Sequence, residues 1–495
     1  MNKFRGTAVP ISLNVIIGLA VSLSGCMVGP DYRQPEAPVP QNWLSSASLP
    51  AVAAETTTQQ AWWQSFNDPI LNRLIEKAAG DNPDLKIAEV RIAESRAARA
   101  SAYAALLPVV NITGNASRQG NQLGFPSGGP SDLSNLVKQP FNIFKSGFDA
   151  SWELDLFGGR RRELESAAAE YEASTLSRQD MLISTLAEVA RTYVDIRLYR
   201  AQLAITQETL DADRKTAAIA RQRFDAGGSP GIEVAQAEAQ VEHANTQLPY
   251  FSNLLAQAEY GLDVLLGEQP GAAHAMVGTG TFIPVSDAKL LLAAPAAVIA
   301  NRPDIRNAER KLAAATAQQG VAVAKFFPDV SLSGFIGLFN TNAGNFLSVG
   351  SKSWNMGGNI LWPILSYGAL SANLEAADAK RREAMAIYQK SVLGALSDVE
   401  RSCTAYIEQE KHLRFQEQAV AADRHVLTIA QERYEAGMTS FMEVLDAERS
   451  LQASENQLAQ AMAQTSRNLI AVYKSIGGGW KPAASAQQLV NDTNK

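Results

Sequence analysis

The stretch Arg-Phe-Asp-Ala-Gly (Arg223–Gly227) recurs as Arg-Tyr-Glu-Ala-Gly (Arg433–Gly437), at an offset of 433 − 223 = 210 residues. Each copy ends a long segment that lacks helix breakers. Residues 160–226 contain no Gly and no Pro, and residues 369–436 contain no Pro and one Gly. Ala, Glu, Arg, Leu and Gln are frequent in both, which favours helices about 100 Å long at 1.5 Å per residue. Such a helix exceeds any single globular core, so it must pack along its length against partners.

The repeat extends over most of the chain. Pro108 matches Pro328 at an offset of 220 residues, whereas Trp152 matches Trp362 at 210, because the first hairpin loop is ten residues longer. Each half is predicted to contain a short helix, two strands, a very long helix, a tight turn and a return helix. The predicted divisions are a signal peptide (1–25), a lipidated N-terminal extended segment with the start of an equatorial region (26–81), a first structural repeat (82–300), a second repeat (301–476) and a tail (477–495).

The N-terminus has the pattern of a secretory signal. Lys3 and Arg5 precede an uncharged, mostly apolar run that ends in Leu-Ser-Gly-Cys. This ending resembles the lipobox of bacterial lipoproteins, which implies that Cys26 carries diacylglycerol and palmitoyl groups as the first mature residue. Met27 follows, and in that pattern a residue other than Asp is compatible with transport to the outer membrane. The alternative is an ordinary signal peptide with an incidental cysteine.

Composition argues against several functions. Removing Lys3 and Arg5 with the signal peptide changes the formal net charge from −6 to −6 − 2 = −8, so the chain lacks the basic character of nucleic-acid-binding proteins. The four histidines are dispersed without metal-ligand spacing, and no phosphate-binding loop or nucleophile motif is present. We therefore expect no enzyme, no metal and no cofactor besides the lipid. Cys403, in a predicted helix, is expected to be a small buried residue.

Four segments alternate polar and apolar residues, as strands between lipid and water do. They are residues 110–117, 148–156, 330–338 and 355–362. After the signal peptide no stretch has the ~18 apolar residues of a membrane helix, so a membrane-spanning part must consist of strands. A soluble hairpin packed on helices would alternate in the same way. The signal peptide and the long helices favour the membrane, and Trp152 and Trp362 are predicted to lie at its interface.

The number of strands predicts an assembly. Four strands cannot close a barrel, and lipid does not tolerate open strand edges, so several copies must contribute. Two chains would give eight strands around a filled interior, whereas three would give twelve strands around a lumen. The short helix and the return helix together are about as long as one long helix, so each chain provides four rods. A solid helical bundle remains the alternative.

Several motifs make the chain similar to a known family. They are Cys-Met-Val-Gly-Pro-Asp-Tyr from Cys26, Trp-Trp from Trp62, Phe-Asn-Asp-Pro from Phe66, Trp-Glu-Leu-Asp-Leu-Phe-Gly from Trp152, Arg-Pro-Asp-Ile-Arg from Arg302, and the paired Ala-Gly turns. The chain resembles the TolC-like outer-membrane efflux channels, in particular their lipoprotein branch (NodT- and OprM-type). The resemblance implies a homotrimer with a twelve-strand β-barrel in the outer membrane, a mixed equatorial region and a twelve-rod α-helical barrel in the periplasm. A periplasmic adaptor and an inner-membrane pump are the implied partners.

The resemblance also implies a gate at the periplasmic tip. A Tyr paired with an acid corresponds to Tyr434 and Glu233, and two acids that narrow the entrance correspond to Glu443 and Asp446. Acids in the first turn of a helix also simply complement its dipole. An Arg that latches some members aligns with Thr439, so we expect the closed tip to be held more weakly or by other pairs. The turn residues expected to contact the adaptor are Gly227, Gly228, Gly437, Thr439 and Ser440.

These features predict the exit duct of a tripartite efflux system, a passive conduit for drugs or other toxic small molecules that is associated with antibiotic resistance. The lipoprotein branch favours a proton-driven pump of the RND type. One alternative is an exit duct for type I protein secretion with an ATP-driven exporter, and another is a periplasmic coiled-coil scaffold without a pore. The sequence does not identify the cargo, because a passive conduit takes its selectivity largely from the pump.

Overall fold

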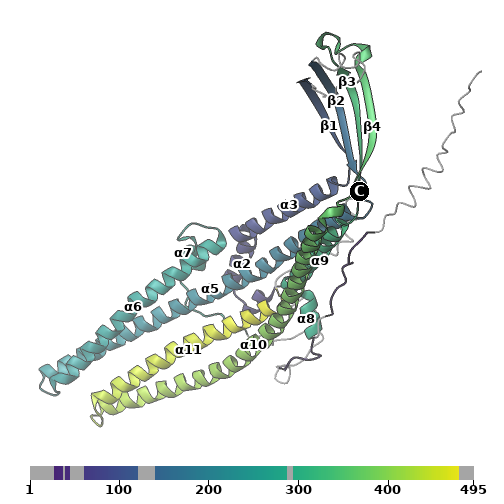
Figure 1. Ribbon diagram of the computed structural model, residues 1–495. Helices are drawn as coiled ribbons and strands as arrows, with labels where there is room; N and C mark the ends of the chain where they lie inside the picture. Colours follow the sequence, from purple (N-terminus) through teal and green to yellow (C-terminus); the bar gives the residue numbers. More distant parts are fainter. Residues whose placement is uncertain (1–26, 37–38, 45–60, 121–139, 287–293, 479–495) are drawn as a thin grey trace, which may run out of the picture. The chain divides into compact units, whose positions relative to one another are not determined.

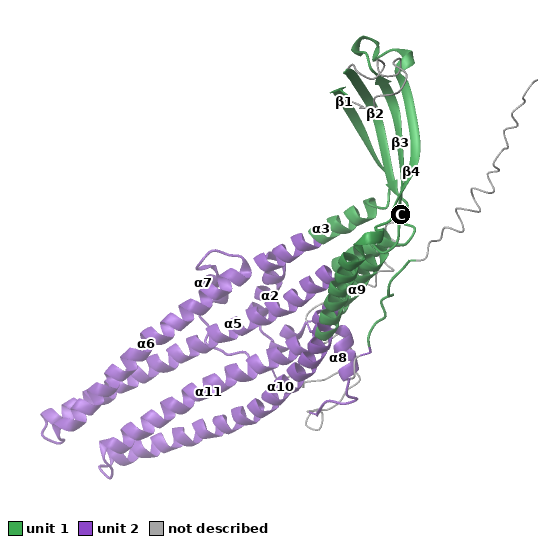
Figure 2. Ribbon diagram, viewed as in Figure 1, with its two compact units in different colours: residues 1–35, 93–172, 309–386 green, residues 36–92, 173–308, 387–495 purple. Residues whose placement is uncertain are grey.

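The computed structural model describes residues 27–36, 39–44, 61–120, 140–286 and 294–478. They belong to two compact units, which Figure 2 shows in different colours. Unit 1 contains residues 1–35, 93–172 and 309–386, and unit 2 contains residues 36–92, 173–308 and 387–495. Each unit therefore contains segments of both sequence repeats. The predicted signal peptide and Cys26 lie outside the described residues.

Unit 1 contains a four-stranded antiparallel sheet with its strands in chain order (Figure 1). The strands are β1 (Val109–Gln119), β2 (Phe141–Glu153), β3 (Asp329–Asn340) and β4 (Lys352–Leu361). β1 and β2 form one hairpin and β3 and β4 another, and β2 pairs with β3 to join the two repeats. The four predicted strands are confirmed, although β2 ends before Leu156. It stops early because Asp155 adopts a left-handed backbone, with φ of 40°, ahead of the next helix.

Two short helices precede the hairpins. They are α3 (Pro83–Ala104) and α9 (Pro303–Ala324), and each begins at the predicted proline. Proline suits the first turn of a helix because its missing N–H would have no partner there. Both helices end about one turn before the prolines at 108 and 328, because a residue that precedes proline is disfavoured in helical conformation.

The two predicted long helices are confirmed. They are α5 (Gly159–Asp225, 67 residues) and α10 (Tyr367–Glu435, 69 residues), the second preceded by a short 3-10 turn, η5 (Ile364–Ser366). The return helices are α6 (Gly231–Leu266) and α11 (Phe441–Ser475). In unit 2, α6 lies beside α5 and α11 beside α10 (Figure 1), and an ion pair crosses each of these contacts. Among the helices of the described ranges, none is both long and apolar enough to cross a bilayer.

The largest apolar cluster of unit 2 lies between the long helices and an N-terminal segment. That segment forms a 3-10 turn, η2 (Trp62–Phe66), and helix α2 (Pro69–Asp81), neither of which the sequence analysis predicted. Trp62 is 2% exposed, and its ring stacks on Tyr473 of α11 with the centroids 5.4 Å apart. The Trp-Trp motif therefore attaches this segment to the end of α11.

The Phe-Asn-Asp-Pro motif starts α2. Asp68 is the N-cap of this helix, and one of its carboxylate oxygens accepts a hydrogen bond of 2.8 Å from the backbone N–H of Ile70. The other oxygen accepts a hydrogen bond of 2.6 Å from the hydroxyl of Tyr193 on α5. Arg197 in turn donates to that hydroxyl. One aspartate thus caps α2 and connects it to the long helix.

The loop between β3 and β4 has local structure that the sequence pattern did not predict. It contains two 3-10 turns, η3 (Ala343–Asn345) and η4 (Val349–Ser351). Ser351 is buried, and its hydroxyl donates to the carbonyl of Asn345 and accepts from the side chain of Asn340. The other hairpin loop, 121–139, lies outside the described residues. Two further short helices, α7 (Ala272–Val277) and α8 (Pro295–Asn301), lie in the connection between the repeats.

Candidate functional site

The two Ala-Gly turns have the same geometry. Gly227 and Gly437 have φ of +73° and +71°, the left-handed conformation that glycine adopts without strain. After each of them, the next backbone N–H bonds to the carbonyl of the arginine that begins the motif: Gly228 to Arg223 at 2.8 Å, and Met438 to Arg433 at 2.9 Å. This is the Schellman motif, which ends a helix by satisfying its last carbonyl groups. The turns therefore reverse the chain between α5 and α6 and between α10 and α11.

Within one chain, Tyr434 and Glu233, the pair that the resemblance implies, are not joined by a hydrogen bond. The tyrosine hydroxyl is buried and has no hydrogen-bond partner among the described residues. The guanidinium of Arg223 lies 4.3 Å from the centre of the tyrosine ring, and the ring of Phe441 packs beside it at 5.6 Å. Glu233 instead lies half-buried in the first turn of α6. Tyr434 thus connects the two turns of one chain through Arg223 and Phe441.

The two predicted entrance acids lie at the start of α11. Glu443 occupies its first turn and Asp446 follows at i+3, and both side chains are exposed. Within the part of the chain that the structure describes, neither carboxylate forms an ion pair or a side-chain hydrogen bond. Ser440 is the N-cap of α11 but makes no side-chain capping bond, and the hydroxyl of Thr439 is buried without a partner among the described residues. The two carboxylates are therefore free to face ions or another copy of the chain.

The turns also carry exposed apolar side chains that the sequence analysis did not identify. Ile232 is 63% exposed, Met438 is 68% exposed and Met442 is 46% exposed. Each lies within five residues of a turn glycine, where solvent-exposed loops usually carry polar residues. An apolar residue so close to a turn glycine was the sequence signal that could have identified these side chains. Exposed apolar side chains at the end of a helical hairpin favour contact with another protein.

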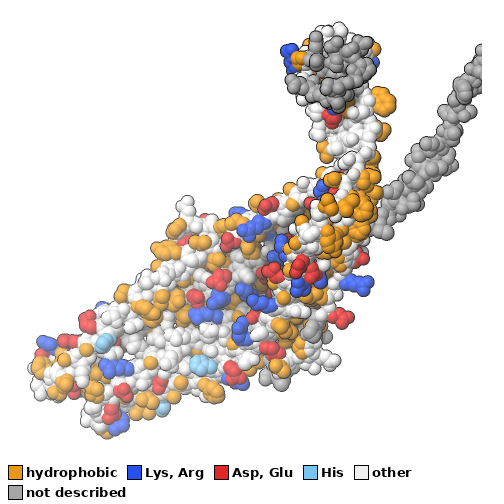
Figure 3. Space-filling model, in the orientation of Figure 1, with side chains coloured by type: hydrophobic (Ala, Val, Ile, Leu, Met, Phe, Trp, Pro, Cys, Tyr) orange, Lys and Arg blue, Asp and Glu red, His pale blue; other side chains and the backbone are white. Residues whose placement is uncertain are grey.

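One face of the sheet in unit 1 is apolar and exposed. Ile112, Phe148, Ile336 and Trp354 are paired in register across all four strands, so their side chains lie on the same face. Their exposed fractions are 77%, 52%, 65% and 76% in that order. Figure 3 shows hydrophobic side chains along the β4 side of the sheet. A soluble sheet would bury such a row, so this face is built for an apolar environment.

The opposite face of the sheet is polar. The row beside the apolar one contains three polar residues, Asn111, Asp149 and Asn355, and in β3 the buried ring of Phe335, over which the ammonium group of Lys145 lies. Thr113 hydrogen-bonds to Asp149, and Lys145 forms an ion pair with the same carboxylate at 3.4 Å. The two faces therefore differ as the alternation predicted, with apolar side chains on one side and hydrogen-bonded polar groups on the other.

The two predicted interface tryptophans have equivalent surroundings. The indole N–H of Trp152 donates to the backbone carbonyl of Leu106 at 2.9 Å, and that of Trp362 donates to the carbonyl of Phe326 at 3.0 Å. The rings are 40% and 57% exposed. In both halves the indole N–H satisfies the hydrogen-bonding capacity of a carbonyl group just beyond the preceding short helix. The rest of the ring stays exposed. This arrangement suits the boundary between water and lipid, and the interface position remains a prediction.

The residues that follow Cys26 are held against unit 1. The guanidinium of Arg162 in α5 is 1% exposed and donates to the carbonyl of Val28 at 3.2 Å and to the carboxylate of Asp31 at 2.6 Å. Gly29 has φ of +88°, and a Cβ there would lie 2.6 Å from the backbone of Gly320. We call these contacts the N-terminal clamp. It explains why the motif has glycine at 29 and acid at 31, a role that the sequence pattern did not indicate.

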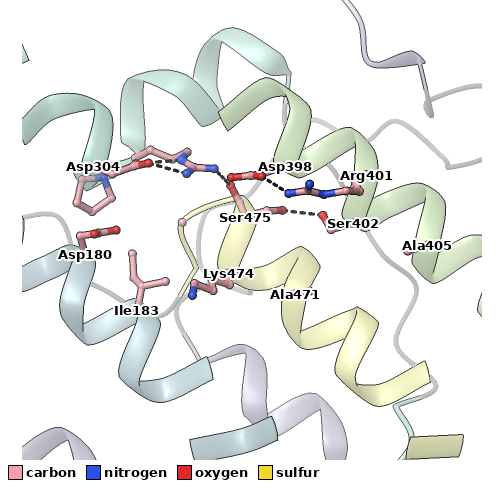
Figure 4. A pocket seen from close by; sticks show the side chains of 13 residues that line it. Asp180, Ile183, Asp304, Asp398, Arg401, Ser402, Ala405, Ala471, Lys474 and Ser475 are labelled. Atoms are coloured by element: carbon pink, nitrogen blue, oxygen red, sulfur yellow. Dashed lines mark hydrogen bonds and ion pairs between the residues drawn. The ribbon is translucent and has the colours of Figure 1, made fainter. Parts of the chain in front are cut away.

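A cavity of about 370 Å³ in unit 2 is lined by charged side chains (Figure 4). Arg302, from the Arg-Pro-Asp-Ile-Arg motif, forms a two-pronged ion pair with Asp304 and donates to the carbonyl of Ser475 at 2.7 Å. Burial raises the pKa of Asp180, and the nearby charge of Asp304 adds to the effect. Lys474 also lines the cavity. The acidic and basic side chains that line the cavity balance in charge. The contact of Arg302 with Ser475 shows that the motif joins the start of α9 to the end of α11.

Comparison with known proteins agrees with these features. The sequence profile described as "Outer membrane efflux protein" matches residues 74–268 and 294–478. Nodulation protein T of Rhizobium leguminosarum bv. trifolii is 31% identical over 471 residues, which cover 94% of this chain and 97% of that protein. The toluene efflux pump outer membrane protein TtgC of Pseudomonas putida is 31% identical over 475 residues, covering 94% of this chain and 96% of that protein. The solved structure of the outer-membrane channel OprN superposes with a TM-score of 0.85 and 32% identity, covering 92% of this chain and 100% of that one.

The similarity spans both halves of the chain, and the helical rods and the small antiparallel sheet are shared with solved outer-membrane channels. The predicted fold is confirmed by these comparisons, as is the predicted place in the outer membrane. The chain therefore belongs to the outer membrane efflux protein family, and it is the outer-membrane exit duct of an efflux system.

Proposed function

We propose that three copies of the chain form one passive channel, in which their sheets close a twelve-strand β-barrel. Among the strands of the described residues, β1 and β4 each have one neighbour, so each leaves an open edge. An open edge carries unpaired backbone groups, which lipid does not tolerate, and pairing β4 of one copy with β1 of the next satisfies both edges. Two copies would give a barrel that side chains fill, whereas three give a lumen. The channel has no catalytic activity of its own.

The observation that carries this proposal is the difference between the two faces of the sheet. The exposed apolar row from Ile112 to Trp354 faces lipid, and the opposite face, which carries the ion pair of Lys145 and Asp149, faces the lumen. Trp152 and Trp362 mark the interface between lipid and water. A barrel whose strands alternate in this way lets water and polar solutes pass while its outside remains compatible with the membrane.

Cys26 carries the lipid anchor in this proposal, through diacylglycerol and palmitoyl groups. The N-terminal clamp supports this role, because it fixes the backbone from Val28 to Asp31 on unit 1, which also contains the strands. Met27, the residue after Cys26, lies against Gly158, where an added Cβ would be 2.7 Å from the methionine side chain. The acyl chains therefore start from a fixed point on the unit that spans the membrane.

The two turns of unit 2 dock a periplasmic adaptor, which connects the channel to an inner-membrane pump of the proton-driven RND type. The exposed side chains of Ile232, Met438 and Met442 support a contact with protein at these turns. The cargo is a small toxic compound, a class that includes the substrate in the name of the toluene efflux relative. Protein secretion with an ATP-driven exporter is the second candidate, because the same turns suit its adaptor.

The gate lies at the same turns. Glu443 and Asp446 are exposed and unpaired within the described part of one chain, so three copies place six carboxylates around the entrance. Tyr434 acts through its contacts with Arg223 and Phe441, while Glu233 is available to a neighbouring copy. Thr439, at the position of the latching Arg, adds no charge. We therefore expect electrostatics at α11 to narrow the entrance.

Photo-crosslinking from Ser440 in living cells tests the proposed partners. A photoreactive residue at Ser440 is expected to capture the adaptor of a proton-driven pump, identified by mass spectrometry. The same residue at Ala372, near the start of α10, is the matched control and should not capture the adaptor. Capture of the adaptor of an ATP-driven exporter would support protein secretion instead. Capture of the chain itself alone would contradict docking at these turns.

A further inference from the structure

Two buried carboxyl groups lie between the two helical hairpins of unit 2, outside the gate residues described above. Asp213 on α5 is 3% exposed, and Glu448 lies on α11, two residues beyond Asp446. Oxygen Oδ2 of Asp213 and oxygen Oε2 of Glu448 are both buried and have no hydrogen-bond partner among the described residues. A buried carboxylate oxygen without a partner makes the charged form costly, so each group favours its protonated form.

The surroundings of the pair come from all four helices. On α5, the hydroxyl of Thr216 donates to Oε1 of Glu448 at 3.5 Å, and on α10 the side chain of Gln431 also hydrogen-bonds to Glu448. Within the described ranges, Arg449 on α11 is the cation that stabilises the charge of Asp213. Its Nε donates to Gln240 of α6 at 2.9 Å, so part of its hydrogen-bonding capacity is directed away from the pair.

Burial and proximity act in the same direction on the two acids. Burial raises the pKa of Glu448 to about 7, and the nearby charge of Asp213 contributes further. Burial raises the pKa of Asp213 to about 6, against the opposing effect of Arg449. Both groups therefore change charge between mildly acidic and neutral pH, whereas ordinary carboxyl groups titrate near pH 4.

We propose that Asp213 and Glu448 form a proton-linked latch that holds the α5–α6 hairpin against the α10–α11 hairpin next to the two turns. The proposal rests on the proposed function in one respect, since it assumes that separating these hairpins opens the entrance. The apolar cluster of Ala220, Val234 and Leu445 joins the same hairpins between the pair and the turns, so hairpin separation at the tip also exposes the carboxyl groups to water. Protonation of the latch thus controls the entrance in addition to the charges of Glu443 and Asp446.

The direction of the pH effect follows from linkage. When the hairpins are together the two acids bind protons more tightly than when they are apart and hydrated. The contact is therefore strongest below about pH 4, where both states are protonated, and weakens as the pH rises to about 7. Above that, two like charges face each other in a buried site. Acidification closes the hairpins, and neutral pH loosens them.

Pulsed electron paramagnetic resonance on the full-length lipidated chain in nanodiscs tests the latch. Nitroxide labels are attached after Ala226→Cys and Ala436→Cys, one at each turn, in a chain that also carries Cys403→Ala. The population with separated turns is expected to rise by at least about tenfold between pH 5 and pH 8, the ratio that corresponds to one unit of pKa. Glu448→Gln and Asp213→Asn each mimic one protonated acid, so each should reduce the response, Glu448→Gln the more strongly because the pKa of Glu448 is raised further, and the double variant should keep the turns together at both pH values.

Two further variants make the outcome decisive. Glu455→Gln, on the same helix at an ion pair with Arg424, is the matched control and should leave the pH response unchanged. A response that persists in Glu448→Gln but disappears in the Glu443→Gln, Asp446→Asn double variant would overturn the latch in favour of the entrance acids. The distances between the nitroxide labels can be measured whether or not the protein conducts ions. A chain that conducts no ions but whose pH response falls in Glu448→Gln would contradict the channel and support the latch.

Discussion

Arg162→Ala is expected to detach residues 27–32 from unit 1 and to destabilise that attachment by about 2–3 kcal/mol. The guanidinium is 1% exposed and donates to Asp31, to Glu165 at 2.7 Å and to the carbonyl of Val28. Hydrogen bonds from a charged donor are the strong class, and the truncation also leaves a cavity at a buried site. The readout is tryptic cleavage after Arg33, followed by mass spectrometry, which should become about 30-fold faster.

The neighbouring Arg160 supplies the matched control. Its ion pairs with Glu153 at 2.9 Å and Glu163 at 3.0 Å are more exposed, so Arg160→Ala should cost less than about 1 kcal/mol. Gly29→Ala should reproduce the effect of Arg162→Ala, because the added Cβ meets the backbone of Gly320 and the residue has positive φ. Equal cleavage rates in Arg162→Ala and Arg160→Ala would show that the clamp does not hold the N-terminal segment.

Trp62→Ala is expected to destabilise unit 2 by about 3–5 kcal/mol, the cost of deleting a large buried aromatic side chain. The ring is 2% exposed, stacks on Tyr473 and packs edge-on against Trp63 and Phe66. Its loss separates η2 from α11 as well as creating a cavity. The thermal midpoint of the helical circular dichroism signal, measured for all variants in the same detergent, gives the comparison.

Two variants define the scale for this effect. Trp62→Phe keeps an aromatic ring against Tyr473 and should lose much less stability than Trp62→Ala. Trp63→Ala removes a ring of the same size from a half-buried position and should fall between wild type and Trp62→Ala. If Trp63→Ala lowered the midpoint as much as Trp62→Ala, the stacking on Tyr473 would not be the contact that fixes the N-terminal segment.

The rods and strands could be predicted because their signals are local. Proline at 83 and 303 and the turn glycines at 227 and 437 mark helix ends through backbone conformation alone. Alternation located the strands because each side of a strand faces one environment over its length. The short helices α2, α7 and α8 lack such a signal, because packing rather than periodicity stabilises a helix of fewer than about four turns.

Contacts between distant residues were not predictable from the sequence. Arg162 and Asp31 are 131 residues apart, and Asp213 and Glu448 are 448 − 213 = 235 residues apart. No periodicity links such positions, and each residue alone resembles an ordinary surface charge on a helix. The surroundings of Tyr434 were not predictable for a related reason: within one chain its hydroxyl has no partner among the described residues, and its ring packs on Arg223 and Phe441 instead.

The conduit itself is tested most directly by recording ion currents from the full-length lipidated protein in planar lipid bilayers. The account predicts discrete conductance steps, and a larger conductance in the Glu443→Ala, Asp446→Ala double variant, because that change removes the carboxylates that narrow the entrance. Glu455→Ala, farther along the same helix, should conduct like wild type. A protein that inserts into the bilayer without conducting would contradict the channel and support a scaffold without a pore.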